Sequence, residues 1–176
     1  MVTDFQKQLR EIREAKDREK RAREEASMAA TNDRLAALEV RFDRLEKMVR
    51  IVEEHADNFA AEVGTFSRSK SFFEGMYQIE LSGEEVLIDE AGALSKRFSR
   101  ISFLLDSAPS VVDADGKGAV LVRCKKTVWS RDLESTSHLV DAVDESLEAF
   151  RDFVREQFLD FAQAYFSDSR RPSPIS

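Results

Sequence analysis

The sequence predicts an α+β protein dominated by helix: a long N-terminal coiled-coil helix, then a small antiparallel sheet packed with a long C-terminal helix. Residues 3–63 contain neither Pro nor Gly, and the second half of this stretch repeats apolar residues at helical spacing. Residues 76–88 and 119–129 show alternation or β-branched enrichment, as strands do. Residues 133–166 return to helical spacing. Together these patterns define the class.

The composition favours long helices. Charged residues make up 35% of the 176 residues, whereas Gly and Pro are scarce, with 6 and 3 copies. A chain of this length suits one domain of ordinary size plus an appendage, and it can bury a core without disulfides or metals.

Residues 1–27 predict a solvated, charged helix. Eleven of the fourteen residues in 13–26 are charged. Pairs four residues apart, such as Glu19 with Arg23, support such a helix by about 0.2–0.5 kcal/mol each. This stretch is expected to be an extended helical spacer that does not pack against other parts of the chain.

A charged helix ahead of a heptad seam resembles the basic-leucine-zipper transcription factors, but the residues do not favour DNA binding. Residues 7–25 carry eight basic and six acidic side chains, and they contain no asparagine to read a base edge. The carboxylates would meet phosphate repulsion in the major groove.

Residues 28–66 predict a dimerisation helix that merges into a core. Taking every third and fourth residue in turn gives an apolar seam that no charge interrupts: Leu35, Leu38, Phe42, Leu45, Val49, Val52, Ala56, Phe59, Val63 and Phe66. From Met48 the apolar face widens, because Ile51 and Ala60 join it. A two-stranded coiled coil needs only a narrow stripe, so the helix is expected to leave its partner chain there and enter a globular core.

The charged flanks of the seam favour a parallel homodimer. With Leu35 at heptad position a, Arg34 and Arg41 occupy position g. Glu39 and Glu46 then occupy position e, so parallel pairing sets Arg against Glu, whereas antiparallel pairing sets like charges together. The predicted interface is Leu35, Leu38, Phe42, Leu45, Val49, Val52, Arg34, Glu39, Arg41 and Glu46. The alternative is that this helix folds against the C-terminal helix of its own chain as an antiparallel pair.

The next segments are expected to begin a small α+β domain over residues 67–166. After a polar connection, MYQIEL and EVLIDE predict a hairpin with Ser82 and Gly83 in its turn. Residues 91–106 fit two patterns, and helix is preferred over strand. The helical face is Leu94, Phe98, Ile101 and Leu105, and the competing strand face is Ile101, Phe103 and Leu105.

The clearest strand is 119–129, which places one set of residues on one side: Val120, Val122, Cys124 and Val128. Asp132 is the expected cap of a long helix over 133–166. The apolar face of that helix is Val140, Val143, Leu147, Phe150, Val154, Phe158, Phe161 and Tyr165. Residues 167–176 are expected to be a disordered tail.

The last predicted strand carries a candidate partner-binding face. Arg123, Lys125 and Trp129 alternate onto one side, and Lys126 lies beside them. Basic side chains interleaved with an aromatic fit a nucleic-acid strand or an acidic peptide. The competing interpretation is an exposed sheet face whose lysines discourage edge pairing.

No catalytic, cofactor-binding or metal-binding residue is predicted. DADGKG at 113–118 begins like a calcium loop, but its twelfth position is Cys124 instead of Glu. Cys124 is expected to pack as a small hydrophobic residue. The only histidines, His55 and His138, are expected in two different helices, and nothing marks a matched acid and base. We therefore expect a protein that is not an enzyme.

The net charge of -7 argues against broad attraction to nucleic acid or to an anionic membrane. One cysteine suits a reducing compartment, and no segment approaches the roughly 18 apolar residues of a membrane span, so a cytoplasmic protein is predicted. The predicted function is an oligomeric scaffold or adaptor, a homodimer or higher homo-oligomer that presents its C-terminal module to a protein partner. The alternative is a nucleic-acid-associated protein that uses Arg123, Lys125, Lys126 and Trp129, and a small enzyme or regulator comes third.

Overall fold

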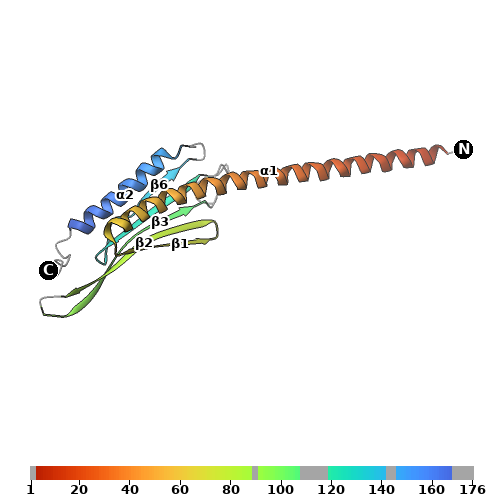
Figure 1. Cartoon of the computed structure of the whole chain (residues 1–176). Helices are drawn as coiled ribbons and strands as arrows, with labels where there is room; N and C mark the ends of the chain where they lie inside the picture. Colours follow the sequence, from red (N-terminus) through yellow and green to blue (C-terminus); the bar gives the residue numbers. More distant parts are fainter. Residues whose placement is uncertain (1–2, 89–90, 108–118, 142–145, 168–176) are drawn as a thin grey trace. The chain divides into compact units, whose positions relative to one another are not determined.

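The computed structural model describes residues 3–88, 91–107, 119–141 and 146–167; the side chains of residues 37, 38, 40 and 87 also lie outside the description. The elements are α1 (Asp4–Val63), β1 (Phe66–Phe73), β2 (Met76–Ile88), β3 (Leu94–Asp106), β4 (Val120–Val128), β5 (Arg131–Asp132), β6 (Thr136–Val140) and α2 (Glu148–Ser167), as Figure 1 shows. The predicted α+β class is confirmed. The chain forms two compact units, residues 1–42 and residues 43–176, and α1 contributes to both.

Helix α1 has a defined start and a defined end. The Gln6 N–H donates to Thr3 Oγ1 at 3.4 Å and the Thr3 N–H donates to Gln6 Oε1 at 3.2 Å, which is a reciprocal cap of the first turn. The helix ends because Gly64 adopts a left-handed φ of 76°, while its N–H still reaches the Ala60 carbonyl at 2.8 Å. A glycine fits this position because it has no Cβ.

The strands form one antiparallel sheet in the order β1-β2-β3-β4-β5, and β6 also pairs with β4. Glu74 and Gly75 connect β1 to β2, with φ values of 48° and 80°. A two-residue turn with both φ values positive matches the twist of the flanking strands. The hairpin turn is therefore at Glu74-Gly75, earlier than predicted.

Ser82 and Gly83 were predicted in a turn, but they lie inside the continuous strand β2. Gly83 pairs with Phe66 of β1. A Cβ on Gly83 would stand 3.1 Å from the Thr65 carbonyl oxygen and 3.2 Å from the Phe66 ring. Glycine is needed here because the neighbouring atoms pack too closely to leave room for a side chain. In a sequence, a glycine in this role looks the same as a glycine in a turn.

The preferred helix over residues 91–106 is wrong, and the strand alternative is right. Strand β3 pairs with β2 along its whole length and with β4 from Arg100 to Asp106. Ile101, Phe103 and Leu105 are buried on one side. Pairing on both edges decides the conformation, and local spacing does not contain that information.

The predicted helix over 133–166 starts too early. Asp132 belongs to β5 and Val140 to β6, so neither is part of a helix, and α2 begins at Glu148. Val143 and residues 168–176 lie outside the described residues. The predicted buried face of α2 is present in Phe150, Val154, Phe158, Phe161 and Tyr165.

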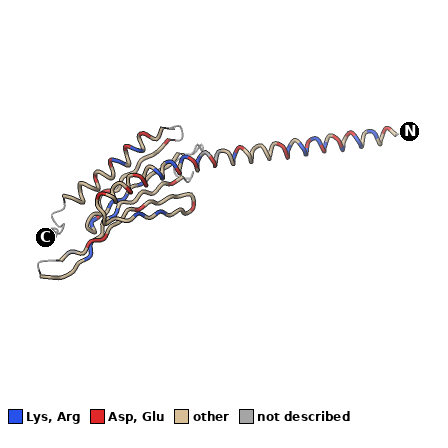
Figure 2. Tube along the Cα trace, viewed as in Figure 1, with Lys and Arg blue, Asp and Glu red and all other residues tan. Residues whose placement is uncertain are grey.

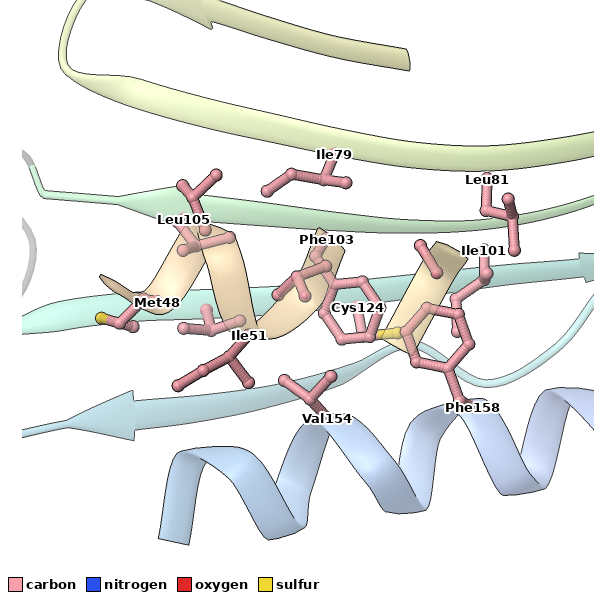
Figure 3. Packing of buried hydrophobic residues seen from close by; sticks show 14 of the residues in the cluster. Met48, Ile51, Ile79, Leu81, Ile101, Phe103, Leu105, Cys124, Val154 and Phe158 are labelled. Atoms are coloured by element: carbon pink, nitrogen blue, oxygen red, sulfur yellow. The ribbon is translucent and has the colours of Figure 1, made fainter. Parts of the chain in front are cut away.

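The core lies between the sheet and the two helices of residues 43–176. Met48 and Ile51 of α1 meet strand residues such as Phe103 and Leu105, and Val154 of α2 completes the cluster (Figure 3). The Arg44 guanidinium donates to the Asp141 carbonyl just after β6, which ties α1 to the sheet at Arg44. Burial of this apolar face is the main stabilising contribution.

The packed part of α1 and helix α2 run in the same direction. Glu54 lies 3.7 Å from Arg151, near the start of α2, and the Phe59 ring lies 6.5 Å from the Tyr165 ring near its end. The contact partners therefore advance together along both helices. The two helices do pack within one chain, but the antiparallel direction of that alternative is wrong.

Candidate interaction surfaces

The predicted coiled-coil seam changes character at the end of the first unit. Leu35 is 55% exposed and Phe42 is 49% exposed, whereas Leu45 is 2% exposed. Heptad spacing continues unbroken across this change. The side chain of Leu38, which lies between the exposed residues, is outside the described residues.

The second half of the predicted dimer interface is occupied by the chain itself. Leu45, Val49 and Val52 are buried in the core of residues 43–176. They belong to the core cluster that residues of α1, the sheet and α2 form together, so they are not available to a second chain. Three residues of the predicted interface, Leu45, Val49 and Val52, therefore pack within the core of their own chain.

The charged residues that flank the seam lie on the helix surface. Arg34, Glu39 and Glu46 are exposed, and Arg41 is partly exposed. Basic and acidic residues also follow one another along the preceding turns of α1 (Figure 2). The predicted pair of Arg23 with Glu19 is present at 2.7 Å. Exposed ion pairs of this kind affect orientation more than stability.

The predicted basic face of β4 is divided between the two sides of the sheet. Arg123 and Lys125 are exposed on the side opposite the helices, where Arg123 Nη2 lies 3.8 Å from Asp106 Oδ2. Alternation along β4 places Lys126 on the other side. Arg123 and Lys125 therefore belong to an exposed sheet face with cross-strand charges.

Lys126 is buried between β4 and α2. Its Nζ donates to Gln157 Oε1 at 2.8 Å and lies 3.3 Å from Asp160 Oδ2. Gln157 Oε1 also accepts a hydrogen bond from Thr136 Oγ1 at 2.7 Å. A buried ammonium group requires such acceptors, so this lysine is used inside the fold.

Trp129 is also inside the fold. Trp129 and Ser130 adopt left-handed φ values of 51° and 63°, which ends β4 and turns the chain into β5. The indole stacks on Tyr165 with 4.7 Å between ring centroids, and Nε1–H donates to the Tyr165 carbonyl at 3.2 Å. Such turns usually contain Asn or Gly, so Trp-Ser gives no turn signal in the sequence. The aromatic needed for base stacking is thus absent from the exposed face of β4.

Cys124 and the two histidines have packing roles. Burial raises the pKa of the Cys124 thiol to about 12, which keeps it protonated at neutral pH. His55 stacks on Phe158 and His138 stacks on Phe153. Among the described residues, no group of three His, Cys, Asp or Glu side chains is arranged to hold a metal ion. The DADGKG segment lies outside the described residues.

A further apolar surface was missed by the sequence reasoning. Beyond Gly83 and Arg100, strands β2 and β3 continue as a two-stranded ribbon, which we call the β2–β3 arm (residues 84–88 and 94–98; Figure 1). The sequence held a partial signal, because VLI is a short apolar run and LSKRF places Leu94 and Phe98 on the same side of a strand, but the helical interpretation of residues 91–106 concealed it.

Comparison with protein-family models, with curated proteins and with solved structures found no match. What this chain does is therefore inferred from its own residues. Within the described ranges, no helix has a stretch long and apolar enough to cross a membrane.

Proposed function

We propose that this protein is a non-enzymatic oligomeric scaffold, which pairs two copies in parallel through α1 and presents its α+β unit to a protein partner. The observation that carries the proposal is the change along one seam: Leu35 and Phe42 are about half exposed, while Leu45, Val49, Val52 and Ala56 are buried in their own chain. Exposed apolar residues at heptad spacing on a long helix favour a second helix as their cover.

The proposed dimer contact extends from Met28 to Phe42. Met28 and Leu35 are both exposed and are seven residues apart, so they occupy the same heptad position. Two heptads are fewer than the about three to four that sustain an independent coiled coil. The proposed dimer is therefore weak and depends on concentration, although the ordered helix lowers its entropic cost.

The charge arrangement supports the parallel orientation. Parallel pairing brings Arg34 to Glu39 and Arg41 to Glu46 of the second chain. Each exposed pair contributes at most about 1 kcal/mol, so the charges select orientation and the apolar residues provide affinity. Two linked copies of the α+β unit then gain avidity for a partner that has two binding sites.

Sedimentation velocity of the full chain tests this proposal. Leu35→Asp with Phe42→Asp should remove the pairing through α1, so the weight-average mass at each concentration should fall below that of the wild type. The matched control is Ala29→Asp with Ala36→Asp, which has the same charge and the same seven-residue spacing on another helix face, and it should associate as the wild type does. A wild-type chain that stays monomeric at every concentration, or an unchanged double variant, would contradict the proposal.

A further inference from the structure

Within the described part of the chain, the β2–β3 arm has no strand paired to either outer edge. Strand β1 pairs with β2 only as far as Gly83, and β4 pairs with β3 only from Arg100 onward. Among the strands that the structure describes, residues 84–88 of the arm therefore pair only with residues 94–98. A two-stranded ribbon in water is marginally stable by itself, so it benefits from an additional contact.

One face of the arm is mostly apolar and exposed. Its exposed fractions are 52% for Val86, 59% for Ile88, 72% for Leu94 and 44% for Phe98. The register sets Ile88 opposite Leu94 and Glu84 opposite Phe98, so these side chains share one face. Single exposed apolar residues are ordinary, but four among the six residues of one face suggest a contact surface.

The base of the arm is held firmly. The Ser130 N–H donates to the Phe98 carbonyl at 2.8 Å, and the Phe98 N–H donates to Ser130 Oγ at 3.2 Å. The Trp129 N–H donates to Ser99 Oγ at 2.9 Å, and the Tyr165 hydroxyl bonds to Glu85. These bonds maintain the left-handed turn and fix the base of the arm against the core.

We propose that the arm is a second self-association surface, which pairs with the arm of another copy along the β2 edge. The charges on its apolar face favour an identical partner. Glu84 and Lys96 form an ion pair at 2.9 Å, so this face has no net charge and does not repel its own copy. A nucleic acid or an anionic membrane would instead require a net positive face.

Charge also selects the β2 edge over the β3 edge. In a two-fold antiparallel contact centred on Val86, Glu84 of one copy lies opposite Ile88 of the other, and no like charges face each other. A contact centred on the middle of the β3 segment sets Lys96 opposite Lys96. The backbone of Phe98 is also already bonded to Ser130, which leaves the β3 edge less free.

The test combines this surface with the α1 surface in full-length chains. In the Leu35→Asp and Phe42→Asp background, sedimentation should still detect concentration-dependent pairing through the arm. Adding Ile88→Asp should abolish that pairing. Adding Leu139→Asp, a matched control on β6 with 52% exposure, should leave it unchanged.

The two proposals fail separately. If the α1 variant is equally monomeric with and without Ile88→Asp, the arm proposal is overturned and the α1 proposal stands. If Ile88→Asp alone gives a monomer while the α1 variant keeps the wild-type mass, the α1 proposal is overturned and the arm proposal stands. Circular dichroism checks that each variant is folded, and residue 88 lies outside the core.

Discussion

Leu35 and Val49 occupy the same heptad position of one helix, but their surroundings are opposite. Leu35 is 55% exposed, whereas Val49 is buried in the core cluster of residues 43–176. The sequence around both is regular and apolar at the same spacing. A heptad pattern therefore predicts that a face will be covered, but it does not state whether the cover comes from another chain or from the same one.

The difference divides α1 into two segments with separate consequences. In residues 43–63, substitution should affect folding. In residues 28–42, it should affect self-association and leave folding intact. The largest change in the free energy of unfolding is therefore expected in residues 43–63.

The largest effect is expected for Val52→Asp. Val52 is fully buried, so the substitution leaves an unpaired charge in the core and should lower the free energy of unfolding by about 4 kcal/mol or more. Leu35→Asp should change the same quantity by less than about 0.5 kcal/mol. Urea denaturation measures the free energy of unfolding of both variants. A similar loss of stability in both would contradict the division of α1 into two segments.

A smaller effect is expected at the polar contact beneath α2. Gln157→Leu leaves Lys126 and Thr136 without their shared acceptor and should cost about 2–3 kcal/mol. Lys126→Met removes the cation and should cost much less, because Gln157 keeps Thr136. Thermal unfolding compares the two variants. An equal or larger loss for Lys126→Met would show that the ion contributes net stability.

Gly83→Ala tests the contact between the sheet and the packed segment of α1. The new methyl group would press on Phe66, whose ring packs against Phe59 of α1 at 5.2 Å. We expect a loss of about 1–3 kcal/mol in the free energy of unfolding. Phe66→Leu provides more room, so the double variant should lose less than the sum of the single variants. If the two single losses of stability simply add in the double variant, the clash between the new methyl group and Phe66 is contradicted.

The effect that is smallest at neutral pH is a pH dependence due to Cys124. Its pKa is raised to about 12 in the folded chain from an ordinary value of 9.0. As pH rises between these values, the unfolded chain releases a proton that the folded chain keeps, so stability falls by about 1.4 kcal/mol per pH unit from this group. Cys124→Ala should show a correspondingly shallower decline in denaturation experiments above pH 9. If the stability of the wild type and of Cys124→Ala falls equally with pH, burial of the thiol is contradicted.

Much of the fold could be predicted from residue periodicity, and the errors share one cause. The strand around Cys124 and the buried face of α2 follow directly from their spacing. Residues 91–106 and 133–140 were misassigned because their strand conformation depends on pairing with neighbours that are distant in sequence. Local patterns carry little information about such pairing.

The candidate surfaces were predicted less well, because exposure is a property of the whole fold. Alternation suggested that Arg123, Lys125 and Trp129 share a face, but a left-handed turn at Trp129 moves the indole into the core. Lys126 is buried because Gln157 and Asp160 of α2 supply acceptors. Neither partner is identifiable from the strand sequence alone.

Disulfide formation at equivalent heptad positions tests the central claim most directly. The full-length chain is oxidised as three single variants, Leu35→Cys, Val49→Cys and Ala36→Cys. The fraction of cross-linked dimer is then compared in the absence of reducing agent. If residues 28–42 form a parallel dimer, only Leu35→Cys should give an efficient cross-linked dimer. Of the three positions, only residue 35 faces the same residue of the second chain, whereas Val49 is buried in the core of its own chain. Equal cross-linking at Val49, or cross-linking at Leu35 no greater than at Ala36, would contradict the account.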